Sequence, residues 1–599
     1  MSVQNVRVGF PTASNSTRCL LGCPLLLSET PSVIPSQERA PMFVERQIII
    51  PPKSKACHVH YVDGLLTPEF INSVPIAYNE ALMTGSHVTT LLASLLQTVA
   101  DQFNPSKSFH RVNMTNEELG VNTGRSREDF EQLVQISNCP CFDVGLYLMY
   151  NFKHETQRVL SARFRIDQST VSRKLGQVRA ALLEKFTPLH LNPTREDLLQ
   201  NSTVIADTLF FEQEGSNSHA VVVFGGTYLY HQKSANYSHQ RMSCSGQKKR
   251  NLEKPMVVTS ANGLILQVAG PFPAKDNDAA ILRKIMVTPW FSSMFKSGDV
   301  FVLDRGFRDV KPELEAKGFR VAMPGLLNGR SQLPWNEANI SSAVTKVRCV
   351  VEVRNRSLKR YQIFSDVVDN KNLPHLMDDL RITAAQVNAF EPRFATDQDD
   401  VNVATNILIR MNQPNTLQTV IETNSLCRAR GATFQAIDMP NHLSQLTLMT
   451  QEDLKQLAGP YIRSLAPSYY ADHLDQEHGI KIEVRKEGLS QSLFQSLNVL
   501  DPLLIRARLK SRHSGHQDYQ AFILFDKSFD GFASVKGWYC QCLSGARTTL
   551  MCAHSFVVTW YLCYGRHQGV IRKPAQFLDG HFDLDVLQDD VISELENEQ

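Results

Sequence analysis

The sequence lacks long apolar runs, because no segment approaches the roughly 20 consecutive apolar residues that a membrane-spanning helix needs. Its apolar patch Cys19–Leu27 is short, contains Pro24, and lacks the charged start and cleavage signature of a signal peptide. We therefore expect an intracellular protein that is neither secreted nor inserted in a membrane. In a reducing compartment the 12 cysteines are expected to be thiols or metal ligands and not disulfides.

The chain also lacks a large net charge of either sign: its 62 basic residues nearly balance its 60 acidic residues. The two signs are nevertheless separated along the chain. From Asp579 onward there are eight acidic residues and no Lys or Arg, whereas Gln157–Lys185 and Lys233–Lys254 are basic. Basic segments offset by an acidic tail, residues 576–599, favour a polyanionic partner.

The chain is too long for one core, and its 599 residues predict roughly three to five domains. Short apolar or β-branched runs bounded by Gly, Asn, Asp or Pro predict strands of a mixed sheet. These runs are Val221–Phe224, Met256–Thr259, Leu264–Ala269 and Val300–Asp304. Helical periodicity returns after Thr345, and a poorly patterned middle, Phe390–Val499, precedes a short β-rich module.

Two short amphipathic helices with a tight polar turn between them are predicted over residues 155–185. The expected inner face of the first helix consists of Val159, Leu160 and Ala162. Ile166 fills the turn, and Asp167 is suited to cap the second helix. Apolar residues at helical spacing bury that second helix: Val171, Leu175, Val178 and Leu182.

The opposite face of the second helix carries short hydrogen-bonding side chains and one guanidinium: Ser169, Thr170, Ser172 and Arg173. Side chains of this kind at the start of a recognition helix contact base edges in the major groove of DNA. The pattern therefore predicts a helix-turn-helix that binds double-stranded DNA. An ordinary helical hairpin with a solvated basic face is the alternative.

Three segments, in order, resemble the PIF/Harbinger-like branch of DDE superfamily transposases. They begin at Phe224-Gly-Gly-Thr-Tyr, at Val302-Leu-Asp-Arg-Gly-Phe and at Val344-Thr-Lys-Val-Arg, with Asn277-Asp278-Ala279 between the first two. The resemblance covers roughly residues 120–390. It implies an RNase H-like α/β domain and three carboxylates that bind Mg²⁺ or another divalent metal for phosphodiester cleavage.

By this resemblance Asp304 is the second acid and Glu352 the third, the latter on a helix that begins near Thr345. The first acid falls where this chain has Gly225, which offers no side-chain oxygen. Asp278 lies nearby in sequence, but nothing in the sequence shows that it takes over this role. Taken singly, Asp304 is equally a turn former and Glu352 a surface group.

The turn Lys248-Lys249-Arg250 is predicted to contact phosphate in the same domain. The same three residues also suit a nuclear-import signal or plain solvated surface.

Cys540, Cys542, Cys552 and His554 have the spacing C-x-C…C-x-H, which resembles a SWIM-type zinc finger. Two cysteines at i and i+2 on a strand point to the same side, and a Cys-x-His at a helix start can complete a tetrahedron around Zn²⁺. Some members of the same transposase branch carry such a finger at the C-terminus. Four buried residues without a metal are the alternative.

A weaker zinc candidate near the start pairs Cys19-x-x-x-Cys23 with Cys57-x-x-His60 across a Pro-rich connection, with His58 as a competing ligand. It would be a degenerate N-terminal finger. The alternative is two unrelated pairs of half-buried thiols.

The sequence thus predicts a multidomain α+β protein with a helix-turn-helix region, an RNase H-like DDE domain with a mixed sheet, and a small zinc-binding SWIM-type module. The expected segments are 1–65, 116–192, 219–390, 391–500, 501–575 and 576–599. We expect a nuclear, transposase-derived DNA-binding protein whose nuclease is impaired at Gly225. An active metal-dependent transposase is one alternative, and a zinc-stabilised scaffold for protein partners is another.

Overall fold

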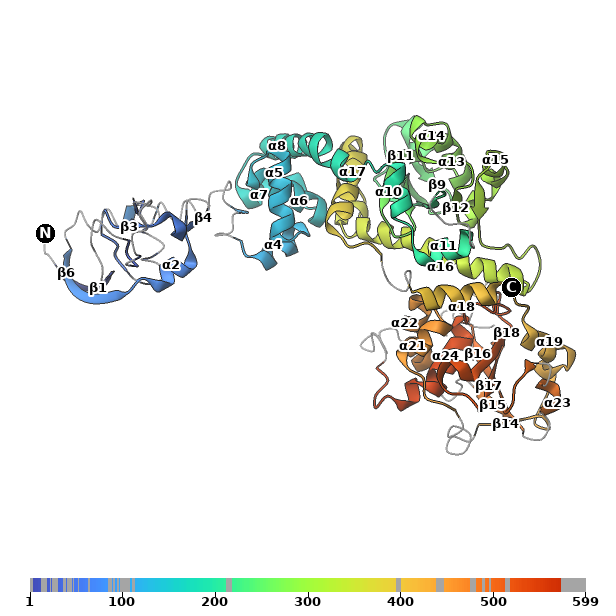
Figure 1. Cartoon of the computed structure of the whole chain (residues 1–599). Helices are drawn as coiled ribbons and strands as arrows, with labels where there is room; N and C mark the ends of the chain where they lie inside the picture. The colour runs from blue at the N-terminus through green and yellow to red at the C-terminus, as the bar shows by residue number, and fades with distance from the viewer. Residues whose placement is uncertain are drawn as a thin grey trace, which may run out of the picture. The chain divides into compact units, whose positions relative to one another are not determined.

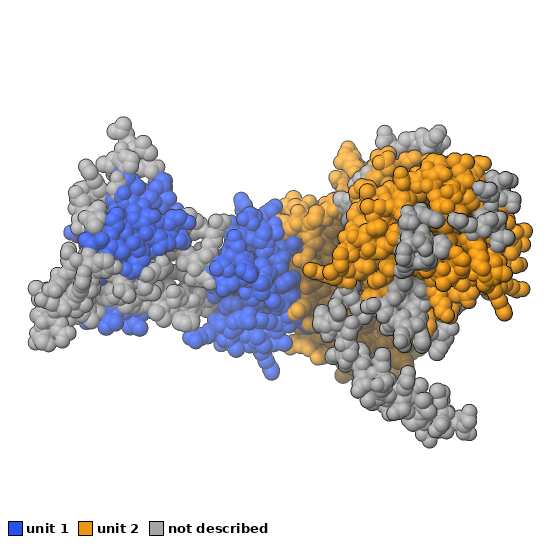
Figure 2. Space-filling model, turned by 90° about the horizontal axis from the view of Figure 1, so that it is seen from below, with its two compact units in different colours: residues 1–182 blue, residues 183–599 orange. Residues whose placement is uncertain are grey.

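The computed structural model describes residues 4–11, 114–211, 218–394, 400–437, 446–474, 481–486, 491–494, 497–511 and 518–572, together with parts of 19–109. The chain divides into two compact units, residues 1–182 and 183–599 (Figure 2). Helices and sheets occur in both, so the chain is a multidomain α+β protein (Figure 1). The acidic tail, 576–599, lies outside the described residues. No helix among the described residues is long and apolar enough to span a membrane.

The N-terminal part of the first unit consists of short strands around an apolar core. Strand β1 (Gln4–Pro11) pairs antiparallel with β6 (Ile76–Met83). Between them lie β2 (Ser32–Val33), β3 (Lys55–Ala56), the 3-10 turn η1 (His58–His60), β4 (Tyr61–Val62), β5 (Leu65–Leu66) and α2 (Pro68–Ser73). Thr67 caps α2 by accepting a hydrogen bond from the backbone N–H of Phe70, which is itself buried in this core.

Five helices are described in the remainder of the first unit, over residues 114–182: α4 (Asn116–Thr123), α5 (Arg127–Ser137), α6 (Cys141–Lys153), α7 (Gln157–Phe164) and α8 (Gln168–Ala181). Polar caps begin several of them; Thr115 and Glu118 form a capping box on α4, and Thr156 caps α7. Residues 142–151 of α6 are all buried, so α6 is the central helix of this group.

The buried face of α7, the first of the two predicted helices, differs in part from the expected inner face. Val159 is 48% exposed and Ala162 is exposed, whereas Leu160 and Phe164 are buried. Leu160 and Phe164 are one helical turn apart, so the buried stripe runs through them, and Val159 lies on the neighbouring, solvated side. Val171, Leu175 and Val178 bury α8 as expected.

The second unit opens with η3 (Leu182–Phe186), α9 (Thr187–His190), α10 (Arg195–Gln200) and α11 (Val204–Phe211). Its first sheet contains β7 (Val221–Gly226), β8 (Leu229–Tyr230), β9 (Cys244–Ser245), β10 (Arg250–Ser260), β11 (Ile265–Pro273), β12 (Val300–Val302) and β13 (Arg320–Ala322). The strand order is β11-β10-β7-β12-β13, with β8 and β9 also paired to β10. Pairing is antiparallel from β11 to β7 and parallel from β7 to β13, which confirms the predicted mixed sheet.

Helices and turns surround this sheet (Figure 1). They are α12 (Tyr237–Ser243), α13 (Asp278–Met286), α14 (Pro289–Met294), η4 (Arg305–Val310), α15 (Lys311–Ala316), α16 (Trp335–Lys359), η5 (Gln362–Phe364), η6 (Asn370–Asn372) and α17 (Leu373–Phe390). Side chains alternate across β7: Val222 and Phe224 pack in the core with α13 and α14, whereas Gly225 faces Val351 on α16. The two faces of one strand thus contact different helices.

Helix α16 begins ten residues before the expected start near Thr345. Pro334 is its N-cap, and no helix breaker follows before Thr345. Some polar side chains in the first turns of α16 are buried and hydrogen-bonded, so apolar residues alone do not mark the buried face of this helix. The side-chain amide of Asn339, for example, donates to the carbonyl of Met411 (3.0 Å) and to Thr548 Oγ1 (2.8 Å).

The rest of the second unit forms one further body. Its helices and turns are α18 (Val401–Met411), α19 (Thr416–Thr423), η7 (Leu426–Arg428), α21 (Gln451–Leu457), α22 (Pro460–Leu474), α23 (Gln491–Phe494), η9 (Gly531–Ser534), α24 (Ala553–Cys563) and η10 (Gly565–His567). Its sheet runs in the order β14 (Phe434–Ala436), β15 (Lys481–Arg485), β16 (Pro502–Lys510), β17 (Asp518–Asp526) and β18 (Val535–Cys540). Since β14 pairs with β15 and β15 pairs with β16, the sheet extends across the boundary expected at residue 500.

Candidate functional site

Gly225 lies near the end of β7, and Asp304 follows the end of the adjacent strand β12. The parallel register pairs Val302 with Val223, and Asp304 and Gly225 each lie two residues further along the chain. A Cβ on Gly225 would lie 2.7 Å from both Cγ1 and Cγ2 of Val351. The side-chain position beside Asp304 therefore faces α16, and the Val351 isopropyl group occupies its space.

Asp304 is held by the turn that follows it. It is the N-cap of η4, and its Oδ1 accepts a hydrogen bond from the backbone N–H of Gly306 at 2.7 Å. Its other carboxylate oxygen, Oδ2, lies 4.0 Å from Nη1 of Arg348 on α16.

Arg348, which lies near Asp304, also forms an ion pair with Glu352. Nη1 of Arg348 lies 2.9 Å from Oε1 of Glu352, one helical turn further along α16. The structure thus brings together the two acids that the sequence singled out, with a guanidinium between them. Glu352 is exposed, so the ion pair with Arg348 is largely in contact with water.

Asp278 is the third acid at this position, and sequence reasoning left its role open. It begins α13, behind the cap residue Asn277. A Cβ on Gly306 would lie 2.5 Å from Asp278 Oδ2 and 3.0 Å from Asp304 Oδ1, so both carboxylates border the same glycine. Burial raises the pKa of Asp278, and the charge of Asp304 raises it further. In the sequence, the indication of a role for Asp278 was the position of Asn277-Asp278 at a helix start between two family motifs.

Asp278, Asp304 and Glu352, all described in the structure, do not bring three ligand atoms within 4.8 Å of one another. Two Mg²⁺ ions a few Å apart require oxygen ligands that converge from several side chains. Gly225 supplies no oxygen, and Arg348 is placed between two of the acids. The side chains as arranged fit a two-ion site poorly.

The basic turn Lys248–Arg250 joins β9 to β10 and is exposed. Lys248 Nζ lies 5.3 Å from the ring centre of Tyr228, and the guanidinium of Arg250 lies 5.5 Å from that of Tyr230. Burial raises the pKa of Tyr228, and the charges of Asp278 and Asp304 add to the effect. Tyr228 therefore neighbours both the basic turn and the acids.

The predicted recognition face on α8 is accessible. Ser169, Ser172 and Arg173 are exposed and Thr170 is half-buried. Arg173 donates only a long, exposed hydrogen bond to Gln177 (3.4 Å), one turn along the helix. Two other basic residues of this segment are less available: Lys174 pairs with Asp143 at 2.5 Å, and Arg179 is buried against Tyr147.

Cys540, Cys542, Cys552 and His554 converge, and their ligand atoms all lie within 4.8 Å of one another. Cys540 ends β18, Cys552 caps α24, and His554 follows in its first turn. The three cysteines are buried and the histidine is half-buried. Three sulfurs and one imidazole form a donor set suited to a closed tetrahedral zinc site.

A tight turn between β18 and α24 shapes this cluster. The backbone N–H of Cys540 donates to the carbonyl of Gly545 (3.0 Å), and the N–H of Gly545 donates to the carbonyl of Cys542 (2.9 Å). A Cβ on Gly545 would lie 2.1 Å from the Cys540 carbonyl oxygen, so only glycine fits there. Burial raises the pKa of Cys540, whereas hydrogen bonds from Cys540 and Cys542 lower that of Cys552, which favours a thiolate at Cys552.

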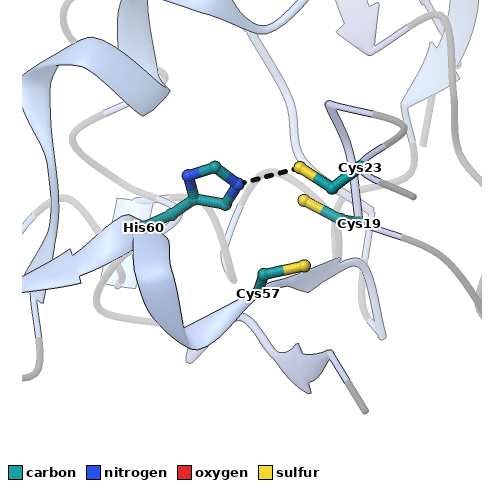
Figure 3. Close-up of side chains that lie close together, drawn as sticks. All are labelled: Cys19, Cys23, Cys57 and His60. Carbon is teal, nitrogen blue, oxygen red and sulfur yellow. Dashed lines mark hydrogen bonds between the residues drawn. The ribbon is translucent and has the colours of Figure 1, made fainter. Parts of the chain in front are cut away.

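Cys19, Cys23, Cys57 and His60 form a second convergent cluster in the N-terminal part, and their side chains point toward one another (Figure 3). Cys23 Sγ lies 3.1 Å from Nε2 of His60. The cluster contains His60 and not the competing His58, which is exposed. Burial raises the pKa of Cys57 to about 12, and the neighbouring Cys19 contributes. The long, Pro-rich connection between the two pairs therefore does not keep them apart.

Comparisons with known proteins assign one part of the chain. Residues 224–388 match the family model described as DDE superfamily endonuclease, so this part is a transposase-like DDE endonuclease domain. No curated protein is detectably similar to the chain. Two solved structures are similar: a pre-cleavage Mos1 transpososome at 13% identity and a TM-score of 0.16, covering 41% of this chain and 75% of that one, and the Mos1 transposase paired-end complex with left transposon end at 14% and 0.15, covering 52% and 97%.

Proposed function

We propose that this chain, which carries a DDE superfamily endonuclease domain over residues 224–388, is a transposase-derived DNA-binding protein whose nuclease is impaired. The observation that carries the proposal is the pair Gly225 and Asp304. Gly225 lies on β7 and Asp304 directly follows the adjacent parallel strand β12, but only one of the two positions has a carboxylate.

The surroundings of the remaining acids support the same conclusion. Arg348 contacts both Asp304 and Glu352, so a cation of the protein itself offsets their negative charge. A divalent ion at this position would have to displace that guanidinium and would still lack a carboxylate from β7. Phosphodiester cleavage by two Mg²⁺ ions is therefore poorly supported by these side chains as arranged.

DNA binding is supported by two basic surfaces. One is the exposed face of α8 with Arg173, which is placed for contact with base edges. The other is the turn Lys248–Arg250 in the DDE domain, where cations lie over Tyr228 and Tyr230. Each surface supplies positive charge to phosphate, and aromatic rings beside cations suit contact with bases as well.

The finer assignments belong to the same proposal. The order of the motifs favours the PIF/Harbinger-like branch with an RNase H-like core, and the Cys540–His554 cluster favours a SWIM-type finger holding Zn²⁺. The N-terminal cluster would hold a second Zn²⁺. The proposal also includes a nuclear location, and zinc modules that offer surfaces for protein partners.

The test of impaired cutting is nicking of supercoiled plasmid DNA by the full chain with Mg²⁺ or Mn²⁺. We expect nicking at background level, equal to that of a Glu352→Gln variant. Robust cutting by the unmodified chain that disappears in Glu352→Gln would refute the proposal. Plasmid binding by gel shift in the same samples shows that the protein is folded and engaged with DNA.

One observation favours a second candidate, an active metal-dependent endonuclease. Asp278 and Asp304 border the same glycine, so Asp278 can supply the oxygen that Gly225 lacks, although from a helix and not from β7. Cutting that is lost in Asp278→Asn and in Asp304→Asn identifies this candidate.

A further inference from the structure

Two histidines and a glutamate converge on the DDE domain, at a place that no sequence motif marked. Ligand atoms of His231, His239 and Glu253 all lie within 4.8 Å of one another. They come from three elements: His231 follows β8 and forms an isolated bridge with Val368, His239 lies in α12, and Glu253 lies in β10. His231 is 4% exposed, and the other two side chains are half-buried.

Each of these side chains has a buried polar atom without a hydrogen-bond partner. The atoms are Nε2 of His231, Nε2 of His239 and Oε2 of Glu253. Leaving such an atom unsatisfied destabilises the fold, and more so if the group is charged. Three unsatisfied atoms on the side chains of one cluster are explained together if one cation lies between these side chains.

The hydrogen bonding of His231 leaves its lone pair directed at this position. Nδ1 of the ring lies 2.9 Å from the backbone carbonyl oxygen of Gln232. Because a carbonyl oxygen only accepts, Nδ1 carries the proton, and Nε2 of the neutral ring is free to bind a metal. Burial lowers the pKa of His231, and the neighbouring His239 lowers it further, whereas hydrogen bonding to the Gln232 carbonyl and the Asn370 side chain acts in the opposite direction. Burial raises the pKa of Glu253.

We propose that His231, His239 and Glu253 bind a divalent transition-metal ion. Two imidazoles and one carboxylate suit Zn²⁺, Mn²⁺ or Fe²⁺ and, unlike the two cysteine clusters, provide no sulfur. A cavity of about 430 Å³ is bordered by His239 and Glu253, together with Ser234, Asn236 and Asn370. A fourth coordination position therefore opens onto this cavity, where water or a small oxygen ligand completes the shell.

The ion would fasten α12 to the sheet. The basic turn Lys248–Arg250 lies between α12 and β10, that is, between His239 and Glu253 in the chain. A metal bound to both His239 and Glu253 would link the two ends of the segment that contains this turn. The inference stands on the cluster itself and does not depend on whether the acids at Asp304 cut DNA.

The test uses the full chain, loaded with excess Zn²⁺, desalted and measured for metal content per chain. We expect His239→Ala and Glu253→Gln each to lose about one ion per chain. His375→Ala is the matched control, because it removes an exposed histidine of α17, the helix that also borders the cavity, and should lose none. Each substitution is repeated with Asp304→Asn, which excludes ions held by the acids beside Gly225.

Two further measurements keep the result decisive. With Co²⁺ in place of Zn²⁺, His239→Ala should lose only the part of the visible absorption that comes from cobalt bound by nitrogen and oxygen, while the visible and near-ultraviolet bands of sulfur-bound cobalt persist and show that the variant is folded. Glu253→Gln should lower the melting temperature of metal-loaded protein. Equal metal content in the unmodified chain and both variants would overturn the proposal. So would a raised melting temperature in Glu253→Gln, since removing an uncompensated buried charge stabilises a metal-free cluster.

Discussion

Gly225 and Val351 are in such close contact that a Cβ on the glycine would lie 2.7 Å from both methyl carbons of the valine. Val351 immediately precedes Glu352 on α16, and it is β-branched and therefore stiff. We expect Gly225→Asp alone to leave DNA cutting at background level, because the carboxylate has no space. Gly225→Asp combined with Val351→Ala provides that space and is the variant in which Mg²⁺-dependent nicking would return.

Stability gives an independent check on this contact. Gly225→Ala should lower the free energy of unfolding by about 1–3 kcal/mol, as expected for overpacking of a core. Gly226→Ala is the matched control, since a Cβ there meets its nearest neighbour at an ordinary 3.6 Å. Equal urea midpoints for the two variants would show that α16 yields easily, and then Gly225→Asp alone would suffice.

A prediction for DNA binding concerns Arg173. Arg173→Ala should weaken binding by roughly 1–3 kcal/mol if the side chain contacts a base, and should reduce the slope of log K against log salt by about 1 if it contacts phosphate. Arg173→Lys separates these cases, because it keeps the charge but not the paired donors of the guanidinium. Full affinity for DNA in both variants, measured by fluorescence anisotropy, would show that Arg173 on α8 does not contact DNA.

Much of the DDE domain could be predicted because its strands are short apolar runs with clear boundaries. The runs at Val221 and Val300 are β7 and β12, and Asp304 follows the second of them as expected. The start of α16 was missed because buried polar residues such as Asn339 obscured its periodicity. The burial of Asn339 depends on hydrogen-bond partners more than seventy residues away. A local sequence pattern contains no information about such partners.

The metal clusters show the same limit. Cys540 to His554 lie within one short stretch, so their spacing predicts convergence. His231 and Glu253 are separated by a helix and a turn, and they meet only because β10 pairs antiparallel with β8. The pairing of Glu253 with Leu229 sets this register, and the sequence contains no comparable signal.

A prediction for zinc compares two buried cysteines of the C-terminal body. Cys552→Ser should lose about one Zn²⁺ per chain and lower the melting temperature, because Cys552 both caps α24 and faces Cys540, Cys542 and His554. Cys563→Ala should keep the metal. Cys563 is equally buried but outside the cluster, and burial raises its pKa to about 12, as for a protonated core thiol. Identical zinc content in the two variants would show that the cluster is metal-free.

The final prediction concerns Asp278 and pH. The raised pKa of Asp278 means that the folded protein holds its proton at pH values where the unfolded chain has released it. Stability contributed by this group therefore falls as pH rises above the unfolded value of about 3.9. In metal-free buffer Asp278→Asn should be more stable than the unmodified chain at pH 7, and the difference should vanish near pH 3.

Asp276→Asn is the matched control, because Asp276 pairs with Lys284 at 2.5 Å and its loss should not stabilise the protein. Urea unfolding at several pH values gives the comparison. If Mg²⁺ at millimolar concentration stabilises the unmodified chain but not Asp278→Asn, the carboxylates of Asp278 and Asp304 hold an ion between them. That outcome would favour the active endonuclease over the impaired one, because the burial and the repulsion from Asp304 that raise the pKa of Asp278 would then be the cost of holding two acids at a cation site.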